Sequence, residues 1–457
     1  GDGWHGYVRS SSTQREGLVT NLDMAATVLD LLGIDVPTRV LGNPMRADGS
    51  TVPLDRRIDQ LVELKETAVA IDTAKPAILN GFITLTTLVL LAATFVLLRA
   101  RRWTESTVHG ASWTLKKALL FVVAVPPAST LMFVFDVRPE NAQQATGVFV
   151  MVTVAIWGVG LLLQRFSRLR IPIAVLSLAC AAIMLADQWL GAPLSFSSFL
   201  GYSPLLAARY YGLGNEGAAL LFGALLVGFA YMLDEYREAP WTRFAARWVL
   251  PAVGLVAVAT AAAPFWGANV GVAAWGVVGF AVAWALMNGY RLSWRLLAVI
   301  LLTIVALVVV FSAVDLLAGD GSQTHLGRAW SSAASGGLGE LWIIVVRKAE
   351  TNLRVLTRTN WSYLLIAVLG FLGFMRWRPQ GDFAETLDEN PYFSAAMAAS
   401  IIGGAAAYLT EDSGIVIPAL IMLYVGVGIL YLMLARLTGG NSAPAGQAEE
   451  PTAVTAS

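Results

Sequence analysis

The chain offers very little sulfur or histidine chemistry. It contains one cysteine, Cys180, and three histidines among 457 residues. Because Cys180 lies inside an apolar run, no disulfide and no cysteine-based metal site can form within one chain, and no disulfide-linked partner is expected. HExxH, GxSxG and Walker motifs are absent too, so no motif indicates a zinc protease, an α/β-hydrolase or a P-loop nucleotide enzyme.

Charge is equally scarce. Only 14% of the residues are charged, compared with about 25% in soluble domains. The formal net charge is zero, so we expect no nucleic-acid partner. By contrast, 56% of the residues are hydrophobic and the mean hydropathy is +0.64. These residues concentrate in runs of the roughly 17–25 residues that cross a bilayer. We therefore predict an all-α polytopic integral membrane protein surrounded by membrane lipid.

The apolar runs predict about eleven transmembrane helices in a domain at residues 76–438. They are expected near 77–98, 118–135, 147–163, 171–190, 216–233, 248–265, 269–287, 294–315, 360–375, 393–409 and 413–435. Residues 1–75 form a small soluble part, in which Arg57–Ala70 is expected to be a short amphipathic helix leading to the membrane. Residues 439–457 are rich in Gly, Ala, Pro and Glu and predict a disordered tail.

The short loops predict an orientation. Arginine and lysine occur in every second loop, whereas the loops between them have almost none. The positive-inside rule then places residues 1–75 outside the cell and residues 437–457 in the cytoplasm, which predicts a plasma-membrane protein of a bacterial cell envelope. The loop arginines, Arg170 among them, are explained by topology alone. Asp136, Asp187 and Asp315 lie near span ends and are interpreted as interfacial.

The soluble part carries a pattern at residues 10–37. Asn21 is the expected cap of a helix over Asp23–Leu32, Gly33 ends that helix, and Pro37 prevents it from resuming. The stretch SSSTQREGLVTNLDMAATVLDLLGIDVP resembles the C-terminal segment of the alkaline phosphatase superfamily, which includes sulfatases, phosphodiesterases and phosphoglycerate mutases. Because the chain begins without methionine, we expect the N-terminal part of such a domain to be missing.

The resemblance implies that residues 1–75 are an extracytoplasmic remnant of an α/β domain whose last helix closes a core. In that superfamily a metal-binding histidine often precedes this segment, and His5 is the residue that would correspond. The resemblance thus implies a divalent metal in the intact domain, with an ordinary loop histidine as the alternative. The family's nucleophile and Asp-His pair have no counterpart here, so the fragment itself cannot perform two-metal phosphoryl chemistry, and other cofactors are unknown.

Polar side chains gather in the connections that we predict to lie outside. Placing an ionisable group at the end of a membrane span costs free energy unless the group binds a ligand or another side chain. Glu216, Glu411 and His325 are therefore candidate catalytic residues. The candidate substrate-binding residues are Arg209, Tyr210, Tyr211, Asn215, Asn269, Arg328, Arg347, Arg354, Arg358, Asn360 and Asp412. Helix capping is the alternative for Glu216, Asn269 and Asp412, and an interfacial aromatic belt is the alternative for the two tyrosines.

The long outer connection between residues 319 and 360 predicts an interfacial helix. Its apolar residues fall on one side of a helical wheel, and Arg347, Arg354 and Arg358 fall on the other. Since the planar guanidinium matches phosphate oxygens, this stripe would hold a phosphate or pyrophosphate head group together with Arg328 and His325. The alternative is a solvated helix that is attracted to anionic lipid.

Three functions remain open. The first is a transferase or hydrolase that acts on a phosphate-bearing lipid-linked or envelope substrate at the outer face, with Glu216 or Glu411 as general base, His325 as the alternative base, and the arginines binding phosphate. Its layout, but no motif, resembles membrane glycan ligases and polymerases. The second is a transporter or flippase for an anionic lipid or solute, although the charges gather at one mouth rather than near the midplane. The third is a membrane anchor for an extracytoplasmic phosphatase-like domain.

Overall fold

The computed structural model describes residues 4–37, 40, 42–134, 138–203, 205, 210–317, 346–347, 350–377 and 381–439. The helices are α1 (Asn21–Leu31), α2 (Leu54–Arg99), α3 (Glu105–Leu131), α4 (Ala142–Phe166), α5 (Ile171–Trp189), α6 (Asn215–Glu235), α7 (Pro240–Phe244), α8 (Leu250–Ala262), α9 (Gly271–Met287), α10 (Trp294–Leu317), α12 (Trp361–Trp377), α13 (Gly381–Glu389), α14 (Pro391–Thr410) and α15 (Val416–Leu437). A further helix covers Glu350–Arg358. Short β1 (Val8–Arg9) and β2 (Arg46–Ala47) pair antiparallel, with Val8 opposite Ala47.

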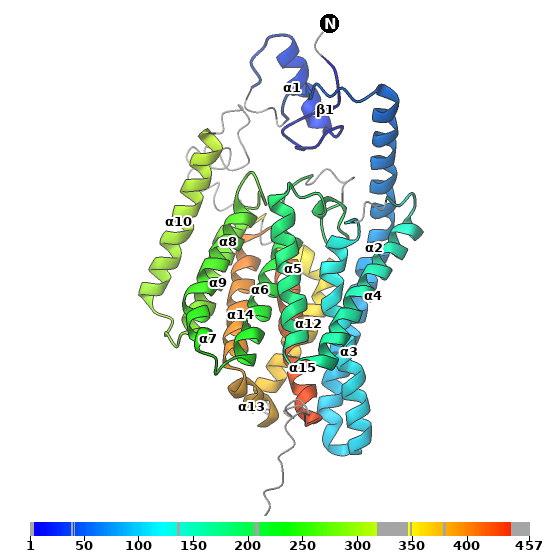
Figure 1. Cartoon of the computed structure of the whole chain (residues 1–457). Helices are drawn as coiled ribbons and strands as arrows, with labels where there is room; N and C mark the ends of the chain where they lie inside the picture. The colour runs from blue at the N-terminus through cyan, green and yellow to red at the C-terminus, as the bar shows by residue number, and fades with distance from the viewer. Residues whose placement is uncertain are drawn as a thin grey trace, which may run out of the picture.

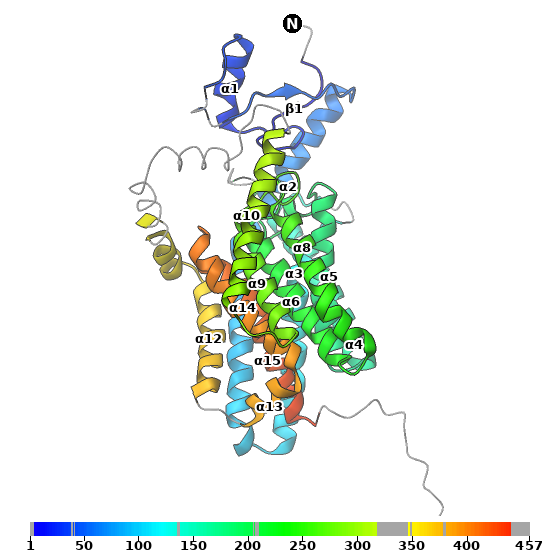
Figure 2. The ribbon, with the colours of Figure 1, turned by 90° about the vertical axis from the view of Figure 1, so that its left-hand side faces the viewer.

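The long helices run side by side in one bundle, with the N-terminal segment at one end and α13 at the other (Figures 1 and 2). Helices α6 and α15 form its centre, because 83% and 94% of their apolar stretches are buried inside the protein. Helix α4 lies at the periphery, where only 17% of its apolar stretch is buried by protein. The outward side chains of such a helix are the ones that lipid covers.

Several of the expected spans are confirmed as apolar helices. Within the described residues, eight helices are long and apolar enough to cross a membrane. A ninth crossing results if Glu350–Arg358 and α12 are one bent span. Helix α9 and the described apolar part of α10, Trp294–Leu307, coincide with two more expected spans but are shorter. A mainly helical, multi-pass architecture is therefore shown, whereas the count of eleven and the orientation remain predictions.

Helix α2 differs from its expected form. The sequence suggested a short amphipathic helix at Arg57–Ala70 followed by a separate span, but the structure has one continuous helix of 46 residues through Pro76. At 1.5 Å per residue this helix is roughly 70 Å long, more than twice the hydrocarbon thickness of a bilayer. Its first turns consequently rise above the bundle and reach the N-terminal segment (Figure 1).

Close packing fixes α6, α9 and α14 against one another. The ring of Phe222 on α6 stands edge-on to Trp275 and Phe280 of α9, at centroid distances of 5.3 and 5.0 Å. A Cβ placed on Gly279 would lie 2.0 Å from the tip of that ring, so this position has no room for a side chain. Small residues at such contacts let membrane helices approach closely. The packing holds the starts of α6 and α9 in a fixed relation.

The N-terminal segment is organised around a buried carboxylate. Asp23 lies on α1, whose N-cap is Thr20, and accepts hydrogen bonds from Ser10 Oγ at 2.8 Å and from the backbone N–H of Asn43 at 2.9 Å. Burial favours the neutral acid, but the hydrogen bonds, including one from Ser12, outweigh it and hold the pKa of Asp23 below its ordinary value. The carboxylate thus ties the loops on both sides to α1.

The apolar face of α1 does not close a core in this chain. The side chains of Met24, Val28, Leu31 and Leu32 are 54–67% exposed, whereas Ala26 is fully buried. The small and polar face of the helix therefore packs against the segment, and the apolar face points outward. The resemblance implies that this helix closes a core only in the intact domain, and that expectation stays a prediction. Whether an alkaline-phosphatase-like domain surrounds it stays a prediction.

Candidate functional site

A chain of polar side chains links three helix starts at the end of the bundle near the N-terminal segment. The side-chain amide of Asn269 donates to Oδ1 of Asn215 at 2.7 Å and to the carbonyl of Leu213 at 3.2 Å. The amide of Asn215 in turn donates to the hydroxyl of Ser413. These residues precede or open α6, α9 and α15. Three side chains that are far apart in sequence thus meet. We call Asn215, Asn269 and Ser413 the polar cluster.

The loops that carry the polar cluster are locked backbone to backbone. The N–H of Leu213 donates to the carbonyl of Gly267 at 2.8 Å. Gly212 has φ +76°, and a Cβ there would lie 2.4 Å from that same carbonyl oxygen. Only glycine meets both conditions, because it alone has no Cβ and adopts positive φ readily. Gly212 therefore allows the two loops to approach closely. Asn269 is buried next to this contact and is only 5% exposed.

Glu411 lies against the start of α9. Its Oε1 accepts a hydrogen bond from the indole N–H of Trp275 at 3.2 Å. A Cβ added to Gly271 would be 1.7 Å from the same oxygen, so the carboxylate occupies the space beside the first residue of the helix. A negative charge is stabilised at a helix N-terminus. Glu411 therefore lies beside the N-terminus of α9, whereas its neighbour Asp412 is exposed.

Glu216 stands on the first turn of α6, next to Asn215, and is half-buried. Its Oε2 lies near Gly214, which packs against the ring of Tyr202. Lys75 on α2 interacts electrostatically with Glu216 and with Asp72. The ammonium group of Lys75 also donates to the carbonyl of Gly201. Lys75, which lies just before the first expected span, is therefore close enough to Glu216 to interact with its charge.

The loop between α5 and α6 carries a pocket next to Glu216, which we call the mouth pocket. Its rim includes Ser195, Tyr202, Tyr210 and Tyr211, and its floor is formed by Met184 and Leu220 of α5 and α6. The other lining residues are Arg15, Thr130, Phe196, Ser198, Leu200, Gly201, Gly212, Leu213, Gly214 and Gly217. Tyr210 and Tyr211, expected at a site or in an aromatic belt, both line this pocket.

Arg15 of the N-terminal segment closes the mouth pocket. Its Nε donates to the carbonyl of Tyr210 at 2.6 Å, and its Nη2 donates to the carbonyl of Ala192 at 2.8 Å. The guanidinium carbon lies 4.3 Å from the ring centre of Phe196, a cation–π contact. Burial lowers the pKa of Arg15 to about 10, while the nearby charge of Asp187 opposes the shift. Arg15 accordingly stays charged at neutral pH.

Asp187 lies at the end of α5, near the expected span end, and its side chain is buried against the following loop. It is 2% exposed and accepts hydrogen bonds from the backbone N–H groups of Leu194 at 2.7 Å and Ser195 at 3.0 Å. The carboxylate at the end of α5 therefore folds the following loop back on itself. That loop supplies Ala192 and Phe196, the partners of Arg15.

The comparisons with known proteins add no relative. No family model, no curated protein and no solved structure matches the chain. The function must accordingly be argued from the site itself.

The expected arginine stripe is only partly described. Arg347, Arg354 and Arg358 are exposed, and the helix Glu350–Arg358 meets α12 at 88°, as a helix in the interface would. Its protein-facing contact is Asn352, which is 6% exposed and donates to the carbonyl of Tyr408 at 2.7 Å. The exposed amide of Asn360 donates to Oδ1 of Asn80 at 2.8 Å. Arg209, His325 and Arg328 lie outside the described residues.

The metal expectation has no support from neighbouring ligands in the described part of the chain. His5 is exposed and its carbonyl accepts a hydrogen bond from the N–H of Gly49 at 3.0 Å. Within the described residues no group of three or more His, Cys, Asp or Glu side chains could hold a metal ion. His5 as a ligand therefore stays an implication of the resemblance.

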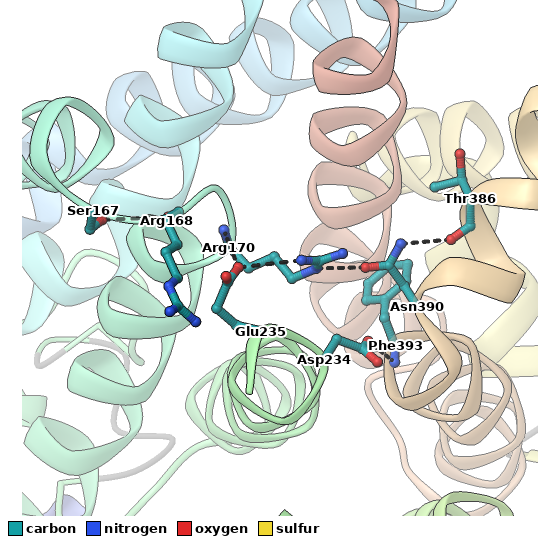
Figure 3. Close-up of polar contacts among 8 residues, drawn as sticks. All are labelled: Ser167, Arg168, Arg170, Asp234, Glu235, Thr386, Asn390 and Phe393. Atoms are coloured by element: carbon teal, nitrogen blue, oxygen red, sulfur yellow. Dashed lines mark hydrogen bonds and ion pairs between the residues drawn. The ribbon is translucent and has the colours of Figure 1, made fainter. Parts of the chain in front are cut away.

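A second polar cluster lies at the other end of the bundle (Figure 3). Arg170 pairs with Glu235 at 3.3 Å, and its Nε donates to Oδ1 of Asn390 at 2.7 Å. Asp234 accepts from the backbone N–H of Phe393 at 2.8 Å and so caps α14. The side chains of Arg170 and Glu235 are 18% and 8% exposed. Arg170 therefore has a structural role beyond its expected effect on membrane orientation, because it joins α5, α6 and α14.

Proposed function

We propose that the chain is a bacterial cell-envelope membrane enzyme, a transferase or hydrolase, that acts on a phosphate-bearing lipid-linked or envelope substrate at the outer face. The observation that carries this proposal is the hydrogen-bonded chain Asn269–Asn215–Ser413. It fixes the surroundings of Glu216 and Glu411 by contacts between residues distant in sequence. Catalytic groups need such a rigid setting, because misplacement by about 1 Å reduces rates strongly.

The arrangement suits a phosphate ester. Three helix starts face the polar cluster, and the positive ends of helix dipoles favour anions. Lys75 adds a cation next to Glu216. Glu216 would take the proton of an attacking hydroxyl group or water as the oxygen bonds to phosphorus, and Asn215 would hold the nucleophile in line. The bond from phosphorus to the leaving oxygen breaks in the same step, and the leaving oxygen takes a proton from water. Glu411, fixed at the start of α9, would be the second candidate base.

The test uses the full chain in lipid nanodiscs, supplied with a lipid extract that contains polyprenyl-phosphate-linked glycans and glycerophospholipids. Transfer or release of a phosphate-bearing group is followed by ³¹P NMR and mass spectrometry. Glu216→Gln should lower the rate by about 100-fold or more, as loss of a general base does. Glu140→Gln is the matched control, because Glu140 is exposed at the same end of the bundle. Full rates in both Glu216→Gln and Glu411→Gln would reject the proposal.

A transporter or flippase for an anionic lipid or solute is the second candidate. The 88° break between Glu350–Arg358 and α12 favours it, because interrupted helices form the binding sites of many transporters. Reconstituted vesicles distinguish the two functions. Proton- or voltage-dependent uptake that Glu216→Gln abolishes, without any covalent change of the lipid, would replace the enzymatic proposal with transport.

A further inference from the structure

The helix Glu350–Arg358 lies across the direction of the long helices. It meets α12, which coincides with an expected span, at 88°. The side-chain amide of Asn352 donates to the carbonyl of Tyr408, near the end of α14, at 2.7 Å. The amide of Asn360, just after the helix, donates to Oδ1 of Asn80, near the start of the first expected span. A helix that is perpendicular to a span and anchored at span ends lies at the depth of the lipid headgroups.

The loop between α14 and α15 holds the same helix in place. A Cβ added to Gly414 would lie 3.2 Å from Oδ1 of Asn352 and 3.3 Å from Cβ of Val355. Gly414 has φ +54°, which glycine adopts most readily. Its neighbour Ser413 belongs to the polar cluster. The helix is therefore packed against a loop of the candidate site, and its outward side chains have a defined direction.

The outward surface of the helix combines an apolar side chain with two cations. Val355 and Leu356 are partly buried and pack against the core. Leu353 is 62% exposed, and Arg354 and Arg358 are exposed as well. At about 100° per residue the two arginines lie roughly 40° apart and roughly 100–140° from Leu353. We call Arg354 and Arg358 the basic edge of the helix.

The charges of the basic edge are not neutralised by the protein. Within the part of the chain that the structure describes, neither Arg354 nor Arg358 forms an ion pair. Glu350 is exposed one turn before Arg354 but does not pair with it. Like charges four residues apart repel on a helix surface. An anion beside the two guanidinium groups would relieve that repulsion, and phosphate oxygens match their planar fork.

The exposed leucine indicates which anion fits. A soluble anion makes no use of an apolar side chain next to the arginines. A phospholipid offers a charged headgroup and acyl chains a few ångströms apart, which is the environment that interfacial helices occupy. The charge of the basic edge favours headgroups with a net negative charge over zwitterionic ones.

We propose that the helix Glu350–Arg358 is a docking surface for anionic phospholipids, with the basic edge on the headgroups and Leu353 among the acyl chains. The inference goes beyond the proposed function and does not depend on it, because it concerns the lipid that surrounds the protein and involves no turnover. It also explains why a helix fixed against the α14–α15 loop carries two cations without partners.

The experiment attaches a fluorescent bimane group beside the basic edge of the full chain in phosphatidylcholine vesicles. Thr357→Cys carries the label, because Thr357 is exposed on the same surface, and the natural thiol of Cys180 is fully buried. Phosphatidylglycerol and phosphatidylcholine with the same acyl-chain spin label are compared as quenchers at equal mole fraction. At low salt, phosphatidylglycerol should be enriched about threefold or more, since one arginine near an anionic surface favours association by about fivefold. In 1 M salt the preference should vanish, because the Debye length falls to about 3 Å.

Variants of the basic edge identify the groups responsible. Arg354→Gln combined with Arg358→Gln should remove the preference for phosphatidylglycerol, whereas Arg354→Lys combined with Arg358→Lys should retain most of it. Arg46→Gln is the matched control, because Arg46 lies in the N-terminal segment, is 68% exposed and pairs with Asp30. Equal quenching by both lipids with the arginines in place would overturn the inference. A preference that survives the double glutamine change, or that is lost in Arg46→Gln as well, would equally overturn it.

The salt dependence is measured with both arginines present, so it decides the question even if the double glutamine variant fails to fold. A preference for phosphatidylglycerol that persists in 1 M salt would overturn the inference, because it would not be electrostatic. Leu353→Ser tests the apolar contact separately. It should reduce quenching by both labelled lipids to a similar extent, and unchanged quenching would overturn the placement of Leu353 among the acyl chains.

Discussion

At the end of the bundle where α13 lies, Arg170 is matched to Glu235 and Asn390, and Asp234 is taken up by backbone N–H groups of α14. At the opposite end, side-chain amides link the starts of α6, α9 and α15, and a pocket lined by Arg15, Tyr210 and Tyr211 lies in the adjoining loop. The first cluster is buried and its charges are paired within the fold. The comparison shows that the polar residues of the two ends are organised differently. At the α13 end the charged side chains pair with each other, and at the opposite end side-chain amides link three helix starts, where we propose that a ligand binds.

The largest effect on stability is expected at the end near α13. Arg170→Ala leaves the buried carboxylate of Glu235 without its cation, and breaking such a pair typically costs about 3–5 kcal/mol. Unfolding in detergent, followed by circular dichroism, measures it. Arg237→Ala is the control, because Arg237 pairs on the surface with Glu238, which is 94% exposed. A loss below about 1 kcal/mol in Arg170→Ala would remove the contrast between the two ends.

Asn269→Ala should have a smaller effect on stability and a large one on function. It removes the donor to Asn215 and Leu213 at a buried position, which costs about 1–3 kcal/mol. Turnover should fall further than stability predicts, since Asn215 loses its fixed orientation. Asn360→Ala, at an exposed amide pair, should change stability by less than about 0.5 kcal/mol. Unfolding and ³¹P assays on the same samples test both. Unchanged turnover in Asn269→Ala would make the cluster purely structural.

Acid should loosen the N-terminal segment, because it protonates the carboxylate of Asp23 that accepts hydrogen bonds from Ser10 and Asn43. The folded-state pKa of Asp23 is lowered, so its contribution to stability is complete above the unfolded pKa of about 3.9. That contribution is lost as the pH falls through the lower folded-state pKa. Limited proteolysis between pH 6 and pH 2 should show the loss, with Asp23→Asn destabilised by about 1 kcal/mol at neutral pH. A segment equally resistant at every pH would contradict the role of this carboxylate.

The smallest effect is expected on the exposed face of α1. Leu32→Ser should change the free energy of unfolding by less than about 0.5 kcal/mol, because Leu32 is 67% exposed. Ala26→Val is the matched change on the buried face and should cost about 1–3 kcal/mol by overpacking. Denaturant titration of both variants makes the measurement. A loss above about 1 kcal/mol in Leu32→Ser would show that the apolar face of α1 is covered in solution.

The local sequence pattern was sufficient to predict most of the helices and some residues of the candidate site. Hydrophobic run length placed most helices, and the cost of charge at a membrane mouth singled out Glu216, Asn215, Asn269 and Glu411, which the structure brings to one end. Whether they act as the site was proposed stays a prediction. Loop position alone gave no reason to single out Arg170, since a loop arginine that orients a membrane protein and one that pairs with a buried carboxylate look the same in sequence.

Arg15 and Lys75 were missed for a different reason. Their partners are main-chain carbonyl oxygens, of Tyr210 and Ala192 for Arg15 and of Gly201 for Lys75. Every residue carries such an oxygen, so these contacts leave no trace in residue type or spacing. The loop contacts of Asp187 were missed for the same reason, because its main-chain N–H donors also belong to residues of any type. For Lys75 and Asp187 the only signal was a position beside a predicted helix end. Arg15 lies six residues before the expected cap Asn21 and had no such signal.

The contact between Gly271 and Glu411 has a mechanical consequence. Since no side chain separates the first residue of α9 from the carboxylate, a shift of α9 along α14 would push or release the acid directly. Movement of one helix and displacement of one negative charge are thereby coupled without any intermediate residue. Replacement of Gly271 by alanine should accordingly move the end of the flexible Glu411 side chain away from the start of α9 and disturb its hydrogen bond from Trp275.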